Sequence, residues 1–161
     1  MSNLDYFTEL GIDKTLKPVS IAHKEISQEE YFKLTISPSF PQIPEFNPNQ
    51  YIYASLSENS ISVIARHNTQ EMFYQAGFVM DRDIEDGTYE LQGGSGSKVQ
   101  ARFITPDNFS PVLLGQNGQI TLKQNKADKT IEATFGYDII YKSEVYKVRN
   151  GTLFLRATGP L

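Results

Sequence analysis

Apolar and polar side chains alternate with a period of two along most of the chain. In residues 30–36, Phe32, Leu34 and Ile36 fall on one side of an extended chain and their polar neighbours on the other. The longest such pattern runs from Ile131 to Tyr141. A β-strand with one buried face requires this period. The same alternation predicts further strands in residues 50–56, 61–65, 88–91, 98–103, 120–123, 145–148 and 153–155.

The spacing of these segments predicts an all-β fold. About nine short strands are typical of two packed antiparallel sheets, so we expect a single β-sandwich domain over residues 1–161. A closed lipocalin-like β-barrel is the alternative. Before the first strand, residues 1–11 are predicted to form a short N-terminal helix, because Ser2 and Asp5 can cap its start and Gly11 can end it.

Glycine-containing dipeptides mark the predicted chain reversals. Asn150-Gly151 stands between two apolar segments, the strongest short signal for a two-residue hairpin. Asn117-Gly118, Asp86-Gly87 and residues 126–128 predict further reversals. Residues 93–97, Gly-Gly-Ser-Gly-Ser, are expected to form a mobile hairpin loop.

Residues 69–80 fit two interpretations. Asn68 and Glu71 resemble a helix-capping pair, and the apolar residues that follow also fit helical spacing. Gly77 disfavours a long helix, and the neighbouring segments on both sides are predicted strands. We therefore predict a strand.

Composition excludes several classes of function. The chain of 161 residues has no cysteine, which removes disulfides, thiolate nucleophiles and cysteine-based zinc sites. Its formal net charge is −4, with no cluster of bases, so we expect no nucleic-acid partner. Neither a signal peptide nor an apolar membrane span is visible, which predicts a cytoplasmic protein; a trimmed secreted form is the alternative.

No catalytic motif is complete. The segment around Ser95 lacks the final glycine of the serine-hydrolase pattern G-x-S-x-G. The histidines, His23 and His67, are far apart in sequence, and the chain has no HExxH, P-loop or GxGxxG motif. We therefore expect a protein that is not an enzyme.

An acidic loop is the candidate metal site. Asp81, Asp83 and Asp86 supply alternating carboxylates of the kind that Ca²⁺ prefers. The spacing does not fit an EF-hand, so the hypothesis is a calcium site at the edge of the sandwich, against an ordinary acidic turn that leads into the next strand.

The most unusual stretch is residues 38–48, where prolines 38, 41 and 44 repeat every three residues. Phe40, Ile43 and Phe46 follow the same period and would form one apolar stripe on a polyproline II helix. The stripe either packs along the protein's own sheet or serves as a docking arm for a partner.

Tyr51 and Tyr53 lie on the side of their strand opposite Ile52 and Ala54. If the aliphatic side faces the core, the tyrosines become candidate surface contacts for a partner. The alternative is that both faces of the strand are covered.

Residues 118–120, 128–135 and 146–155 resemble the closing hairpins of uncharacterised bacterial β-sandwich domains. Any antiparallel sandwich that closes through Asn-Gly shares this resemblance, so it implies the fold alone. The leading hypothesis is a non-catalytic β-sandwich that binds a protein partner or a second copy of itself. The alternatives are a barrel that binds a small apolar ligand, and a Ca²⁺-dependent carbohydrate-binding module or enzyme.

Overall fold

The computed structural model describes residues 3–13, 15, 17–18, 29–40, 43, 45–94, 97–106 and 112–161, with side chains from Tyr6 onward. Among the predicted features, Ser2, His23, Pro41, Pro44 and Ser95 lie outside the described residues. The elements are α1 (Asn3–Thr8), β1 (Tyr31–Ser37), β2 (Gln50–Ser57), β3 (Ser60–Asn68), β4 (Phe73–Asp81), β5 (Gly87–Leu91), β6 (Val99–Ile104), β7 (Leu113–Leu114), β8 (Gln116–Asn125), β9 (Thr130–Tyr141) and β10 (Glu144–Arg156).

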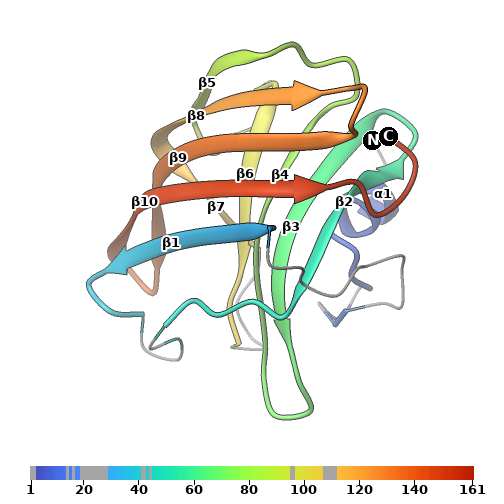
Figure 1. Cartoon of the computed structure of the whole chain (residues 1–161). Helices are drawn as coiled ribbons and strands as arrows, with labels where there is room; N and C mark the ends of the chain where they lie inside the picture. The colour runs from blue at the N-terminus through green and yellow to red at the C-terminus, as the bar shows by residue number, and fades with distance from the viewer. Residues whose placement is uncertain are drawn as a thin grey trace.

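The strands form two five-stranded antiparallel sheets, in the orders β1-β10-β9-β8-β5 and β2-β3-β4-β6-β7. The strands of one sheet run across those of the other, and the sheets are not closed into one barrel (Figure 1). This confirms the predicted all-β antiparallel sandwich in preference to the lipocalin-like barrel.

Aromatic side chains fill the space between the sheets. Phe32 of β1 lies 5.4 Å from Phe135 of β9 and 6.3 Å from Phe78 of β4, measured between ring centroids. Phe78 and Phe135 meet edge to face at 4.8 Å. Such contacts add to the area burial that drives folding. The predicted alternation therefore identifies the buried face of these strands.

Residues 73–81 form strand β4, which confirms that prediction. Val63 of β3 pairs with Phe78, and the register continues without a break along both strands. The capping-like residues start no helix: Asn68 ends β3 and pairs with Phe73, and Glu71 lies in the turn between the strands, where the Thr69 amide donates to the Met72 carbonyl over 3.0 Å.

The outer face of the β2-β3-β4-β6-β7 sheet is covered by α1 and the segment after it. Leu10 and Ile12 pack against Val79 and Ile104. The segment is also held by its carbonyls, which accept hydrogen bonds from side chains of the sheet: Ser62 to Glu9 (2.5 Å), Gln75 to Leu10 (2.9 Å), and Arg66 to Leu10 (3.1 Å) and Gly11 (3.0 Å).

The predicted N-terminal helix is thus confirmed as α1, with Gly11 at a φ of 66° shortly after it. No helix in the described part of the chain has the length and apolar character needed to cross a membrane.

Three of the predicted reversals are wrong. The strands on either side of residues 93–97, β5 and β6, are not hairpin partners, because they belong to different sheets. Asn150-Gly151 lies within β10 and Asn117-Gly118 lies within β8. The β9–β10 hairpin turns instead at Lys142 and Ser143, with φ values of 49° and 67°. The β8–β9 turn at residues 126–129 agrees with the prediction.

The C-terminal residues lie along the free edge of β2. The amide of Ser55 donates to the carbonyl of Pro160 over 2.7 Å, and the amide of Thr158 donates to the carbonyl of Tyr53 over 2.9 Å. The hydroxyl of Thr158 also accepts from the amide of Tyr53 at 3.1 Å. This tail therefore continues the sheet beyond its last strand.

A candidate ligand-binding trough

The apolar side chains of the proline-rich stretch face their own core. Phe40 and Ile43 are buried, and Phe40 contacts the rings of Tyr141 at 4.9 Å and Tyr146 at 4.8 Å. Phe46 is half-buried and packs on the main core cluster. Of the two interpretations of this stretch, the observed packing fits the connection that lies along the protein's own sheet.

Tyr51 and Tyr53 also point into the core, so the expectation that they lie at the surface is wrong. Both are almost fully buried, at 4% and 1% exposure. The Tyr53 hydroxyl accepts a hydrogen bond from the Gln124 side chain at 2.8 Å, and burial raises its pKa. Ile52 and Ala54, on the other side of β2, are buried as well. Both faces of β2 are therefore covered, which is the alternative that the sequence left open.

The acidic loop does not gather its carboxylates. Asp86 accepts a hydrogen bond from the Gln124 amide at 2.8 Å, while the side chains of Asp81 and Asp83 are exposed. Within the part of the chain that the structure describes, no group of three or more His, Cys, Asp or Glu residues is arranged to hold a metal ion. A calcium site here remains a prediction that this arrangement does not support.

His67 has a packing role. Its ring stacks on Tyr74 at 4.9 Å with an interplanar angle of 7°, and its Nδ1 lies 2.9 Å from the carbonyl oxygen of Asn47. These contacts fix the ring beside the connection that leads into β2.

The outer face of the β1-β10-β9-β8-β5 sheet, here called the open face, is not crossed by any described segment in Figure 1. The strand registers align threonines on this face. Thr152 pairs with Thr134, Thr134 with Thr121, and Thr121 with Thr88. The hydroxyls of Thr88 and Thr121 bond each other at 2.8 Å, whereas those of Thr134 and Thr152 have no partner among the described residues.

Next to this threonine row, both Asn-Gly dipeptides form β-bulges that flank Gly136 of β9. The register of β8 shifts between Gln116 and Gln119, and that of β10 shifts between Val148 and Gly151. The asparagines take the left-handed conformation that such bulges need, with φ values of 53° at Asn117 and 55° at Asn150. The open face is therefore interrupted twice at the same level of β9.

Between the bulges lies a hollow of about 580 Å³, which we call the trough. It adjoins a second hollow of about 580 Å³ that extends toward β5. Its floor is Gly136, which has no side chain. The residues lining the trough are mostly neutral and polar: Asn117, Gly118, Gln119, Thr121, Thr134, Phe135, Gly136, Arg149, Asn150 and Gly151.

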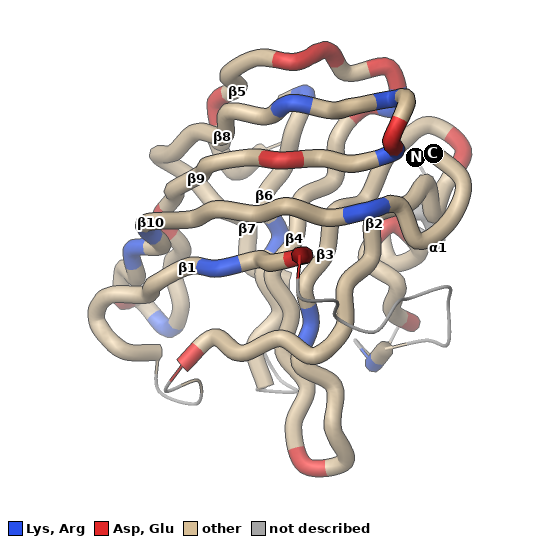
Figure 2. The backbone as a smooth tube through the Cα atoms, viewed as in Figure 1, with Lys and Arg blue, Asp and Glu red and all other residues tan. Residues whose placement is uncertain are grey.

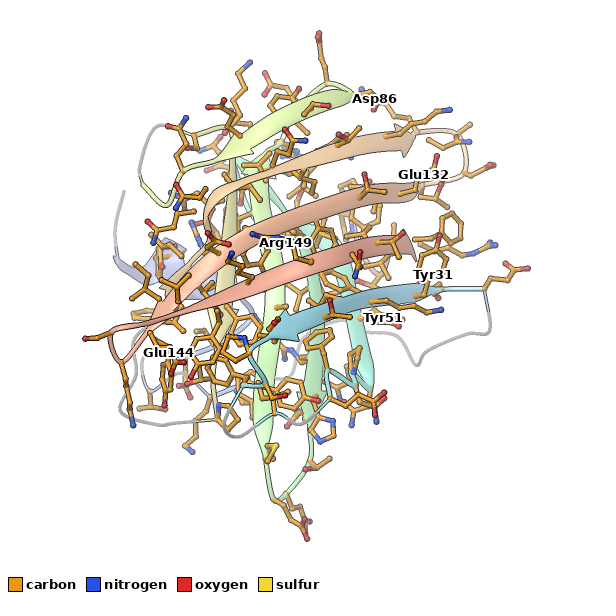
Figure 3. The ribbon with its side chains drawn as sticks, turned by 90° about the vertical axis from the view of Figure 1, so that its left-hand side faces the viewer. Tyr31, Tyr51, Asp86, Glu132, Glu144 and Arg149 are labelled. Carbon is orange, nitrogen blue, oxygen red and sulfur yellow. The ribbon has the colours of Figure 1, made fainter. Side chains whose placement is uncertain are left out.

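Arg149 is the one cation of the trough lining, and its charge is already compensated. One guanidinium nitrogen, Nη2, bonds the Asp138 carboxylate at 2.9 Å. The other, Nη1, donates to the carbonyls of Tyr137 at 2.9 Å and Val148 at 2.8 Å. Figure 3 shows Arg149 at the middle of the open face, with Glu132 and Tyr31 toward one end of the strands and Glu144 toward the other. The trough therefore carries hydrogen-bonding groups with little net charge.

The charged residues around the trough do not give it a strong net charge either. Lysine, arginine and acidic residues are interspersed over the open face, and acidic residues gather along the loop before β5 (Figure 2). The trough is therefore not surrounded by a continuous positive or negative surface.

An aromatic pair stands beside the threonine row. Tyr31 of β1 and Phe154 of β10 lie with ring centroids 6.3 Å apart. The Lys33 ammonium lies 5.4 Å from the Tyr31 ring, and the Arg156 guanidinium lies 6.0 Å from the Phe154 ring. Both rings are half-buried, so part of each remains accessible on the open face.

Sequence reasoning missed the trough because it assigned both Asn-Gly dipeptides to hairpin turns. The sequence shows both Asn-Gly dipeptides. That both lie opposite Gly136 depends on the register of β8 and β10 with β9. Comparisons with protein-family models, with curated proteins and with solved structures found no match to this chain.

Proposed function

We propose that this protein is a non-catalytic binding module that holds an uncharged, hydroxyl-rich ligand, a carbohydrate chain, in the trough. The observation that carries the proposal is the set of unpartnered hydroxyl and amide groups, from Thr134, Thr152 and Gln119, beside a hollow with a glycine floor. Hydroxyl and amide groups both donate and accept hydrogen bonds, as sugar hydroxyls do.

Two further features support this class of ligand. Arg149 is held by Asp138, so the trough offers no uncompensated charge to attract an ion. Tyr31 and Phe154 present accessible ring surface beside the threonine row, which suits the apolar side of a sugar ring. None of these groups belongs to the acidic loop, so we expect binding that does not require Ca²⁺.

A glycan array followed by calorimetry on the best ligand tests the proposal. Thr134→Val removes one hydroxyl, and Gln119→Leu removes one amide. Each is expected to weaken binding roughly 5- to 10-fold, the value of about one hydrogen bond. Ser39→Ala, which removes an exposed hydroxyl after β1, is the matched control and should bind like the wild type. An array with no hit, or full binding by both variants, would overturn the proposal.

A second candidate function, contact with a protein partner or a second copy, is favoured by one observation. Ile140 and Val145 are cross-strand neighbours and are 48% and 47% exposed. We expect light scattering at rising concentration to show a dimer that Val145→Ser weakens if this pair mediates self-association. A monomer at all concentrations excludes the second copy and leaves only a different protein as the partner.

A further inference from the structure

A larger pocket, of about 910 Å³, lies on the other side of the molecule from the trough. It is bounded by Tyr6 of α1 and Glu9 on one side, and by the β2–β3 turn, the end of β4 and the start of β6 on the other. Arg102 and Gln100 of β6 lie among its lining residues. The pocket is therefore a junction between the N-terminal segment and the sheet it covers.

Arg102 is a buried cation in this lining, with 4% of its surface exposed. Its Nε and Nη2 both donate to the Gln100 side-chain oxygen, at 3.1 Å and 2.8 Å. The Tyr6 ring lies 4.2 Å from the guanidinium carbon. Burial raises the pKa of the Tyr6 phenol, and the charge of Arg102 opposes that rise. The guanidinium is thus fixed in orientation by neutral groups.

The charge of Arg102 is balanced by Glu9. Its Nη1 lies 3.5 Å from the Glu9 carboxylate, and both side chains are more than nine-tenths buried. Tight charge-assisted hydrogen bonds of this type are about 2.7–2.9 Å long. Nη1 therefore faces a carboxylate at a distance that leaves the contact incompletely formed.

Further charges in the lining limit what can enter. Lys98 adds a second cation, while Glu58 and Asp81 are exposed acids in the same lining. With Glu9, the lining carries three acids against two cations. An external anion is therefore attracted only where it takes the place of the Glu9 carboxylate beside Arg102, and the net negative charge of the lining repels a dianion more strongly than a monoanion.

We propose that this pocket binds a small monocarboxylate, which contacts Arg102 where the Glu9 carboxylate now lies. Glu9 acts as an internal occupant of the site, and an external carboxylate competes with it. The proposal uses none of the trough residues and stands independently of the carbohydrate hypothesis.

The test is chemical complementation of Glu9→Ala, which removes a group of the size of acetate. We expect this variant to melt below the wild type in sodium chloride. Sodium acetate at equal ionic strength should raise its melting temperature in a saturable manner, by roughly 5–10 °C at a hundred times Kd. Phosphate should be less effective than acetate.

The matched control is Glu29→Ala, which removes the exposed partner of Arg156. The melting temperature of this variant should be the same in sodium acetate and in sodium chloride at equal ionic strength. If Glu9→Ala does not fold, Glu9→Ser also leaves room for acetate beside Arg102 and should show the same preference for acetate. Equal effects of acetate and chloride on the Glu9 variant would overturn the proposal, and a stronger effect of phosphate would overturn the monocarboxylate class. Glycan binding by the Glu9 variants should remain at the wild-type level.

Discussion

Gly118 and Gly136 approach each other so closely that a β-carbon on Gly118 would stand 2.1 Å from the Gly136 carbonyl oxygen. It would also lie 2.5 Å from the α-carbon of Tyr137. Both contacts are with backbone, which side-chain rotation cannot relieve. Strands β8 and β9 can therefore meet at this bulge only if position 118 is glycine.

Gly118→Ala is accordingly expected to lower the free energy of unfolding by about 3 kcal/mol, in the range of overpacked sites. Gly94→Ala is the matched control, since a β-carbon there meets nothing within 4 Å. Urea denaturation of both variants measures the difference. Equal stability of the two would mean that the bulge can open at little cost.

The trough can be filled without disturbing the bulges. A β-carbon on Gly136 would lie 3.3 Å from the Val148 carbonyl oxygen, which is tight but short of a clash. Gly136→Ala is expected to reduce carbohydrate affinity roughly 10-fold, about 1.4 kcal/mol of binding free energy. Calorimetry gives the affinity, and a thermal melt checks that the fold remains. Unchanged affinity in a folded variant would remove Gly136 from the binding surface.

Tyr137 has a fully buried hydroxyl with no hydrogen-bond partner among the described residues. Tyr137→Phe removes this unsatisfied group, so at pH 7 it should stabilise the fold by about 1 kcal/mol. A loss of stability in urea denaturation would show that the hydroxyl is satisfied in solution.

The same residue predicts a pH dependence. Burial raises the pKa of Tyr137 well above its ordinary value of 10.0. The unfolded chain then releases this proton at lower pH than the folded chain does. The free energy of unfolding therefore does not change through this group below about pH 10, and it falls as the pH rises further and the unfolded chain ionises first. Between pH 9 and 11, wild type should lose more stability than Tyr137→Phe, and parallel loss would contradict the assignment.

Asp86 supports the loop before β5 through one hydrogen bond to the Gln124 amide. Asp86→Ala should cost about 1 kcal/mol, the typical value of such a bond. Asp83→Ala, at an exposed position, should have an effect within about 0.5 kcal/mol. We expect Ca²⁺ to leave the melting temperatures of wild type and both variants unchanged. A rise with Ca²⁺ that Asp83→Ala abolishes would restore the calcium hypothesis.

Much of the fold could be predicted because burial imposes a period of two on strands such as β9. Register could not be predicted in the same way. Asn150-Gly151 supplies a positive φ followed by a glycine, which suits a hairpin turn and a bulge equally. Only the register with the partner strand decides between them: the β9–β10 hairpin turns earlier, at Lys142 and Ser143, which leaves Asn150-Gly151 inside β10.

The side of β2 that faces the core illustrates a second limit. Tyr51 and Tyr53 alternate with Ile52 and Ala54, and both sets are buried. One set faces the opposite sheet and the other lies on the covered outer face, so alternation carries no information about which is which. The trough was not visible in the sequence for a different reason: it depends on register shifts in the β8–β9 and β9–β10 pairings. The pocket beside Arg102 was not visible because it joins the N-terminal segment to strands far along the chain.

The backbone contacts of the C-terminal tail bear on how the molecule behaves at high concentration. An exposed strand edge is a template on which other chains can add and aggregate. Pro160 and Thr158 already occupy hydrogen-bonding groups of Ser55 and Tyr53 along β2. Residues 158–160 thereby leave fewer free backbone groups along this edge with which a strand of another molecule could pair.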